Sequence, residues 1–353
     1  MVKTQKYDLS SYRFNIKDFF PYDLFYRITQ AKIDDAESIV NEEFENRIKK
    51  EKPWNSFLVI IAADHPARNV TNVGDNEIAM ANRWEYLGRI LRILILKQID
   101  GIMATPDIIE DLFILNHIFR KNHGKSFMDN KILLGCINRG GLSGSPYEMY
   151  DPVTAYNVDD IKKFNLDGAK IMLRLDLKTV KAKYSQKTLE ICAEVIRKCN
   201  EKKIPVFIEP LPVHLDENHK YRVNRDVKEL VKTVGVATAL GGSSLNLWLK
   251  LPYVDNYELV ALSTTNPILM LGGESTGNPI DMMEKFQKGM SAGKNIRGCL
   301  VGRNILYPGL DDPYAVALGV SEIIHKQKAV SEVISLILNN RGKDLDFLTS
   351  KII

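Results

Sequence analysis

The sequence has no long apolar segment. Nowhere in its 353 residues does an uncharged run reach the roughly 20 residues that a membrane-spanning helix requires. The first seven residues, from Met1 to Tyr7, also lack the apolar core of a secretory signal. These absences predict a cytoplasmic protein that has no membrane partner.

Cysteine is scarce, and the chain contains only Cys136, Cys192, Cys199 and Cys299. No pair of them has the spacing of a structural metal site. Cys192 and Cys199 fall within one helical pattern, too far apart along the helix axis to form a disulfide. The sequence therefore predicts a reduced protein without a metal site.

An excess of one charge is also missing, because 48 Lys and Arg residues face 44 Asp and Glu residues, for a net charge of +4. No basic arm and no nucleic-acid motif is present, so a nucleic-acid partner is not expected. The hydrophobic fraction of 45% is that of an ordinary globular protein. No linker or low-complexity segment divides the chain.

A regular alternation of apolar runs and helical patterns begins at Phe57. The runs read as buried strands at residues 57–63, 101–104, 132–137, 168–175, 205–210, 246–253, 268–273 and 298–303. Helical patterns follow them at 77–97, 106–122, 158–164, 185–202, 224–233, 236–240, 257–264 and 280–292.

This order predicts an α/β fold, a (β/α)8 TIM barrel with N-terminal and C-terminal helical extensions. We expect residues 1–53 to form a helical extension, 54–325 the catalytic barrel, and 326–353 C-terminal helices packed on the barrel. An open, doubly wound sheet is the weaker alternative, because no Gly-rich dinucleotide-binding turn follows the first strand.

The strand at 246–253 has two unlike faces. Leucines at 247, 249 and 251 share one face, while Trp248 and Lys250 share the other, since side chains alternate along a strand. A lysine inside a barrel is costly to bury as a cation, and as a neutral amine it is a nucleophile. We therefore interpret Lys250 as the chemical centre. The alternative is a lysine that reaches water or an ion pair at the strand end.

Other polar residues fall at or near the carboxyl ends of the strands, where TIM barrels carry their active sites. Asp64, Lys170 and Glu209 are candidates for acid–base work, and Asn138 and Arg139 for substrate binding. Lys170 is expected to face the barrel and to favour the neutral form of a neighbouring amine. A plain interior ion pair between Lys170 and Glu209 is the alternative interpretation.

Two Gly-rich segments follow the last two strands. They are Gly272-Gly273-Glu274-Ser275 and Gly302-Arg303. In many TIM barrels the loops at these two places bind phosphate through backbone N–H groups. The pattern thus predicts a phosphate site. The alternative is that the glycines only permit tight turns.

These residues resemble the class I, Schiff-base aldolases of the deoxyribose-phosphate, tagatose-bisphosphate (LacD-type) and archaeal fructose-bisphosphate group. The resemblance spans residues 57–305 and is carried by Ala63-Asp64-His65, Lys170, Glu209, Lys250 followed by Pro252-Tyr253, and Gly302-Arg303. It implies an imine on Lys250, proton handling by Asp64, and an acid/base role for Glu209. Archaeal members carry a tyrosine where Glu209 stands, so the LacD-type pattern is closer.

The resemblance implies an aldehyde-lyase that cleaves or forms a C–C bond in a phosphorylated keto sugar. 6-Phospho-5-dehydro-2-deoxygluconate and ketose (bis)phosphates are the candidate substrates. His65, beside Asp64, would contact the substrate. No cofactor is implied, and a homo-oligomer is expected. The Gly-Gly-Glu-Ser loop and the N-terminal extension depart from the group's pattern and leave the substrate open.

Two other functions remain open at this stage. A metal-dependent aldolase or isomerase would need ligands, of which only His65 and His214 stand near strand ends, and it would lose activity with a chelator. A phosphosugar-binding barrel without turnover would bind its ligand and give no adduct with borohydride. Lys170 competes with Lys250 as the nucleophile.

Overall fold

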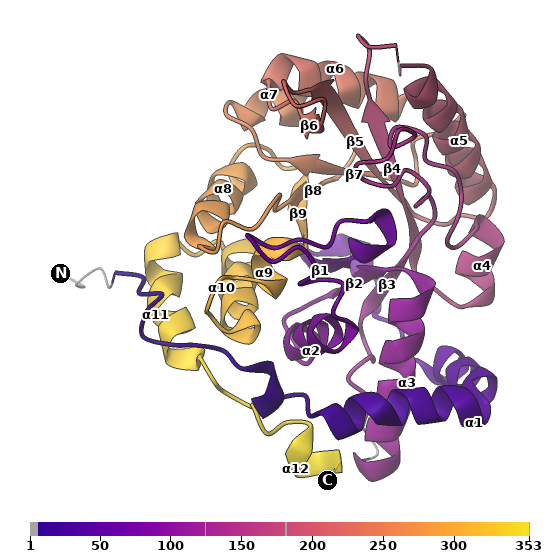
Figure 1. The fold of residues 1–353 in the computed structure, drawn as a ribbon. Helices are drawn as coiled ribbons and strands as arrows, with labels where there is room; N and C mark the ends of the chain where they lie inside the picture. Colours follow the sequence, from indigo (N-terminus) through magenta and orange to yellow (C-terminus); the bar gives the residue numbers. More distant parts are fainter. Residues whose placement is uncertain (1–5, 124, 181, 353) are drawn as a thin grey trace.

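The computed structural model of the chain describes residues 6–123, 125–180 and 182–352. Eight parallel strands form a closed barrel in the order β1-β2-β3-β4-β5-β7-β8-β9, with β9 paired to β1. Figure 1 shows this barrel with helices around it. Its strands are β1 (Leu58–Ala63), β2 (Gly101–Ala104), β3 (Ile132–Cys136), β4 (Gly168–Leu175), β5 (Val206–Leu215), β7 (Leu247–Pro252), β8 (Ile268–Leu271) and β9 (Ile296–Val301). The predicted TIM barrel is confirmed.

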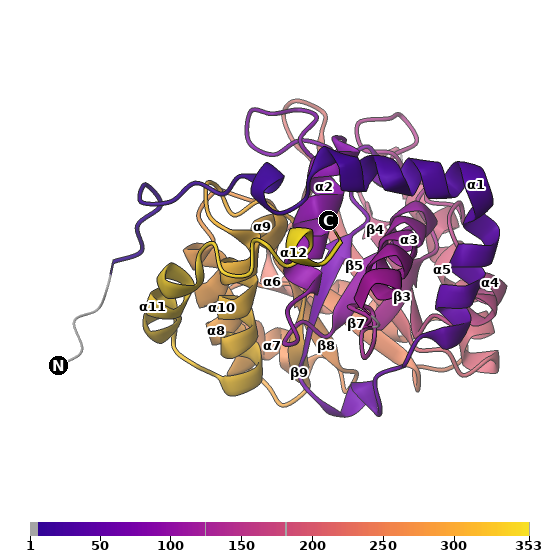
Figure 2. The same ribbon diagram turned by 90° about the horizontal axis from the view of Figure 1, so that it is seen from below.

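The helices that follow the barrel strands pack on the outside of the barrel (Figures 1 and 2). They are α2 (Arg83–Leu94), α3 (Pro106–His123), α4 (Val158–Lys163), α5 (Ala182–Glu201), α6 (Val227–Thr238), α7 (Tyr257–Leu262), α8 (Ile280–Met290), α9 (Arg303–Leu306) and α10 (Pro313–Lys326). The flanking helices are α1 (Tyr22–Asn46), α11 (Val330–Asn340) and α12 (Thr349–Ile352). Within the described part of the chain, no helix is long and apolar enough to cross a bilayer.

The structure differs from the predicted elements in three places. The two helices expected at 224–233 and 236–240 are one helix, α6, because the apolar positions Leu230, Val234 and Ala237 continue a single buried stripe past Gly235. Asp226 caps this helix by accepting from the N–H groups of residues 228 and 229. Helix α2 begins at residue 83, since Asn82 caps it, and not at residue 77.

The third difference concerns the strand predicted to end at Pro210. β5 continues to Leu215 and turns back as β6 (Tyr221–Val223), which pairs with it antiparallel. Pro210 and Pro212 do not end the strand, because β4 supplies the partners there, from Leu173 to Leu175. The resulting hairpin rises above the carboxyl ends of the strands.

Two separate apolar layers hold the barrel. Side chains such as Val59 and Ile61 of β1 face outwards to the helices, while Leu58 and Ile60 face the interior. Trp54 packs against the interior core, with ring-centroid distances of 5.6 Å to Phe207 and 5.7 Å to Trp248. Aromatic rings thus fill the interior below the carboxyl ends of the strands, so polar groups above them lie on an apolar floor.

The two ends of the chain are tied to the barrel by buried ion pairs. Arg92 of α2 binds Asp312 at 2.7 Å, and both side chains are fully buried. Its guanidinium also donates to the main-chain oxygens of Lys343 and Asp344. Arg341 in turn binds Asp311 at 2.7 Å, and the hydroxyl of Tyr7 donates to the same carboxylate. These contacts fasten the segments before α1 and after α11 to the barrel.

Candidate active site

Four of the predicted residues form one continuous chain of charged contacts inside the barrel. The Lys250 amine lies 3.0 Å from Glu209, the Lys170 amine lies 2.6 Å from the same Glu209 oxygen, and Lys170 lies 3.4 Å from Asp64. All four side chains are buried. Asp64 directly follows β1, and β4, β5 and β7 supply one residue each, so the closed barrel is what brings the four together.

Strand register sets the height of each group. Met172 pairs with Glu209, and Phe207 pairs with Trp248, so Glu209 and Lys250 stand two residues above the aromatic layer. Lys170 is level with Phe207 and therefore lies deeper. The side chain of Lys170 is 0% exposed, whereas that of Lys250 is 7% exposed. Lys250 is thus the lysine closer to the barrel mouth.

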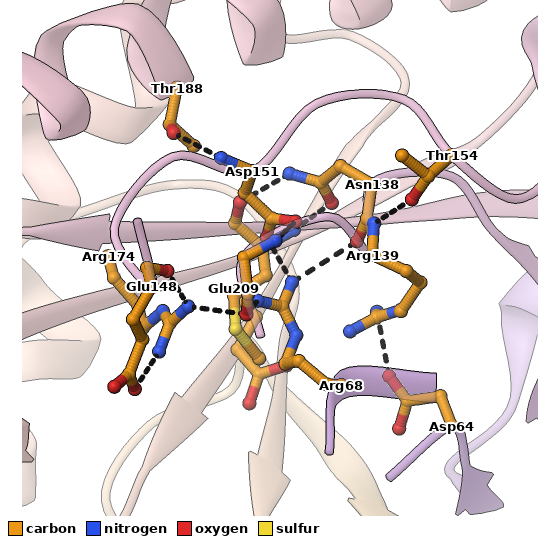
Figure 3. Close-up of polar contacts among 12 residues, drawn as sticks. Asp64, Arg68, Asn138, Arg139, Glu148, Asp151, Thr154, Arg174, Thr188 and Glu209 are labelled. Atoms are coloured by element: carbon orange, nitrogen blue, oxygen red, sulfur yellow. Dashed lines mark hydrogen bonds and ion pairs between the residues drawn. The ribbon is translucent and has the colours of Figure 1, made fainter. Parts of the chain in front are cut away.

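Arg139 joins the network from the loop after β3. Its guanidinium lies 2.7 Å from Asp64 and is almost fully buried. Figure 3 draws this ion pair. Burial raises the pKa of Asp64, but Arg139 and Lys170 outweigh burial and hold that pKa well below its usual range. Asp64 is therefore a carboxylate at neutral pH. Nε of Arg139 has no hydrogen-bond partner among the described residues.

The pKa values of Glu209 and Lys170 are both lower than usual. Burial raises the pKa of Glu209, yet the two neighbouring lysines overcome this and lower it from 4.5 to about 2. Burial, aided by Arg139, lowers the pKa of Lys170 despite its carboxylate neighbours. Glu209 is therefore ionised at neutral pH, and Lys170 is a lysine whose proton is held less firmly than usual.

The stability of the protein is expected to fall in acid because of these carboxylates. Glu209 has a folded pKa of about 2 against 4.5 in water, so it contributes stability above about pH 4.5, which is lost as the pH falls towards 2. Urea unfolding at pH 6, 4.5 and 3.5 measures this loss. Glu209→Gln should show a shallower decline over this interval. An equal decline in both proteins would contradict the assignment.

His65 stands beside Asp64, with Nδ1 4.0 Å from the carboxylate and no hydrogen-bond partner for Nδ1 among the described residues. Burial lowers the pKa of His65 to about 3, so the ring is neutral. A Cβ atom on Gly302 would lie 2.4 Å from the His65 ring, so Gly302 is required for the close approach of β9 to this histidine.

The loop between β3 and α4 contains a second buried polar cluster, which sequence reasoning missed (Figure 3). Arg68 bonds to Asp151 and to the main-chain oxygens of residues 138 and 141. Arg174 pairs with Glu148 at 2.5 Å. No local sequence spacing identifies these pairs, because their partners lie 26 or more residues apart. They fix the loop that carries Arg139.

Asn138, predicted to bind substrate, is engaged elsewhere. Its amide nitrogen donates to the main-chain oxygen of Met172 at 2.7 Å, and its amide oxygen accepts from the Met172 N–H at 2.8 Å. The side chain is fully buried. This pairing holds β3 and β4 together just above Lys170 and favours a structural role for Asn138.

The segment 272–275, after β8, is shaped by one side chain. The amide nitrogen of Asn304 donates to the main-chain oxygens of Gly272, Gly273 and Glu274, at 2.8, 3.3 and 3.0 Å. In a trans peptide the N–H points away from the C=O, and the described chain contains no cis bond. The N–H groups of residues 273, 274 and 275 therefore face away from Asn304, and none of them donates a hydrogen bond to another described residue. Such a run of free N–H groups is an anion-binding geometry.

Two more residues of the predicted phosphate site, Ser275 and Arg303, connect this segment to α9. The Ser275 hydroxyl donates to the main-chain oxygen of Tyr307 at 2.6 Å, which ties the segment to the end of α9. Arg303 begins α9 and lies 3.6 Å from the carboxylate of Glu274. Nε of Arg303 has no hydrogen-bond partner in the described part of the chain. The two predicted Gly-rich loops thus meet in space.

Among the described residues no group of three His, Cys, Asp or Glu side chains is arranged to hold a metal ion. The four cysteines are free and buried. A groove of about 610 Å³ lies outside the barrel, lined by residues of α4, α5 and the loop before α4. The groove shares no residue with the charged network.

Comparison with known proteins identifies the family. The family model described as Cgl0159-like matches residues 56–321. The solved structure of Cgl0159 from Corynebacterium glutamicum is 34% identical, covers 87% of this chain and 98% of that chain, and gives a TM-score of 0.78. A comparison with curated protein sequences finds no match.

More distant structures share the fold. An archaeal fructose-1,6-bisphosphate aldolase, solved with its catalytic lysine bound to a carbinolamine intermediate, is 18% identical over 81% of this chain and 99% of that chain, with a TM-score of 0.51. The fructose-bisphosphate aldolase from Slackia heliotrinireducens is 13% identical over 88% of this chain and 92% of that chain, with a TM-score of 0.59. The family model matches most of the barrel, and the match with the Corynebacterium relative covers nearly the whole of that protein. This chain therefore belongs to the Cgl0159-like family.

Proposed function

We propose that the protein is a class I aldolase of the LacD-like pattern, which cleaves or forms a C–C bond in a phosphorylated keto sugar through an imine on Lys250. The observation that carries this proposal is the contact of the Lys250 amine with Glu209, at 3.0 Å, inside a buried network at the barrel mouth. Imine-based C–C cleavage uses an amine and a carboxylate within hydrogen-bond distance of each other, as these two groups are.

The reaction follows from these groups. The Lys250 amine adds to the ketose carbonyl, and the carbinolamine takes up a proton and loses water to give an iminium ion. The Glu209 carboxylate removes the proton from the hydroxyl on the carbon that leaves as an aldehyde. The C–C bond breaks, its electron pair moves to the iminium as an enamine, and the aldehyde departs. Protonation of the enamine carbon and addition of water release the ketone and regenerate Lys250.

The remaining groups have supporting roles. Lys170 bridges Glu209 and Asp64, so it orients the base. Asp64, fixed as an anion by Arg139, faces the same network and would position a substrate hydroxyl or the carbinolamine. The free N–H groups of residues 273–275 would bind the phosphate of the sugar. 6-Phospho-5-dehydro-2-deoxygluconate and ketose (bis)phosphates fit this description.

Lys250 is preferred to Lys170 as the nucleophile on geometric grounds. Lys170 is enclosed and contacts two carboxylates, whereas Lys250 contacts one and is partly reached by solvent. An imine also needs the amine to be reached by the substrate carbon, and of the two lysines Lys250 is the more exposed. The phosphosugar-binding barrel without turnover remains the second candidate, because a phosphate site alone would serve both functions.

Turnover tests the proposal directly. A panel of phosphorylated ketoses, assayed for aldehyde release with a coupled dehydrogenase, should contain at least one substrate. We expect the rate to be unchanged after treatment with EDTA, since the reaction uses the lysine as its electron sink. Aldehyde release that EDTA abolishes would favour the metal-dependent alternative. Binding without release would favour the binding protein.

A further inference from the structure

A cation outside the predicted site lies against the Gly-rich segment. Arg225 stands in the connection between β6 and α6, and it is exposed. Its Nη2 atom lies 3.4 Å from the position that a Cβ atom would occupy on Gly273. The guanidinium therefore lies beside Gly273, in the segment whose N–H groups donate to no described residue.

Arg225 has no partner of its own in the part of the chain that the structure describes. Within residues 6–123, 125–180 and 182–352, no ion pair and no hydrogen bond uses its side chain. The neighbouring Arg222, in contrast, binds Asp216 at 2.9 Å. Arg225 has five donors, lies beside the free N–H groups of residues 273–275, and pairs with no carboxylate of the described residues. These properties are those of a phosphate ligand.

The charge balance of the segment also calls for a second cation. Arg303 is partly offset by Glu274, whose carboxylate lies 3.6 Å away. A phosphate monoester carries close to two negative charges at neutral pH. The free N–H groups contribute only partial charges, and Glu274 opposes the anion. Arg225 supplies the positive charge that Glu274 removes.

We infer that Arg225 is a specificity-determining residue that binds the phosphate of the substrate, opposite Arg303 and above the N–H groups of residues 273–275. Arg225 follows β5 and its hairpin, Gly273 follows β8, and the strand between them is β7, which carries Lys250. The bound phosphate would thus stand over the carboxyl end of β7. This inference rests on the proposed function for the nature of the substrate, but not for the existence of the anion site.

Inorganic phosphate is the first probe, measured by isothermal titration at low salt. Arg225→Ala should raise the dissociation constant for phosphate about tenfold to a hundredfold, because a charge-assisted hydrogen bond is lost. Arg225→Lys should show a smaller increase, since the charge remains without the planar pair of donors. Arg222→Ala is the matched control, with the same loss of charge three residues away, and should leave the constant unchanged.

A pair of ketones links the site to catalysis. With dihydroxyacetone, which has no phosphate, borohydride trapping on Lys250 should proceed equally in the unaltered protein and in Arg225→Ala. With dihydroxyacetone phosphate the variant should require a roughly tenfold or greater excess of ligand for the same extent of trapping. This difference between the two ketones is what a phosphate ligand predicts and what a merely structural arginine does not.

Three results would overturn the inference. They are an absence of saturable phosphate binding by the unaltered protein, an equal effect of Arg222→Ala and Arg225→Ala, and a phosphate constant that Arg225→Ala leaves unchanged. A failure of Lys250 to trap either ketone would instead count against the aldolase proposal. In that case the phosphate titration alone still decides the role of Arg225.

Discussion

Lys250→Met is expected to abolish aldehyde release while the protein stays folded. Methionine fills a similar volume and has no charge to bury. Glu209 keeps the Lys170 amine at 2.6 Å, so the carboxylate is not left without a cation. Lys250→Arg should be equally inactive, because a guanidinium remains protonated and cannot form an imine. Steady-state rates and circular dichroism at the same temperature measure both properties.

Lys131 provides the matched control for the loss of a buried lysine. It lies in the loop before β3, and its amine donates to the main-chain oxygens of Leu96 and Ile99, both at 2.6 Å. Lys131→Met removes a lysine of the same burial, away from the mouth, and should retain turnover below its melting temperature. Turnover that survives in Lys250→Met would remove this lysine from the mechanism and direct attention to Lys170.

Glu209→Gln is expected to slow C–C cleavage by a factor of about a hundred to ten thousand, the usual contribution of a positioned acid or base. The amide keeps the shape of the carboxylate but cannot accept the hydroxyl proton. Imine formation on Lys250 should persist, so single-turnover mixing with borohydride should still yield an adduct. The variant thus separates attack by the amine from bond cleavage.

Glu43 offers a control carboxylate of similar burial. It belongs to α1, is buried, and accepts hydrogen bonds from Asn116 and Arg120 of α3. None of these residues belongs to the charged network at the barrel mouth. Glu43→Gln should leave the rate of cleavage unchanged at a temperature where both proteins are folded. Near-normal cleavage by Glu209→Gln would instead assign the base to Asp64, the other carboxylate of the network.

Much of the fold was predictable because each strand is a short apolar run with a helical pattern after it. Alternation along single strands placed Lys250 and Lys170 inside, and the structure has both there. The helix joined across Gly235 and the extension of β5 past Pro210 were not predictable in this way. In both cases a residue that usually interrupts an element is tolerated because a neighbouring element supplies packing or hydrogen bonds.

The candidate site was likewise predictable only in part. Residues at the ends of predicted strands, such as Asp64 and Glu209, could be named in advance, since parallel strands end on one rim. The pairing of Arg68 with Asp151 and the contact of Arg225 with Gly273 join segments that the sequence does not relate. The role of Asn138 also depends on such a contact, because its amide bonds are made to β4.

The site of covalent attachment tests the account most directly. The protein is incubated with borohydride and a phosphoketose that it cleaves, and the modified peptide is sequenced by mass spectrometry. The account predicts one reduced, substrate-sized addition per chain, located on Lys250 and missing from Lys250→Met. An addition on Lys170, or no addition with a ketose that the protein demonstrably cleaves, would contradict it.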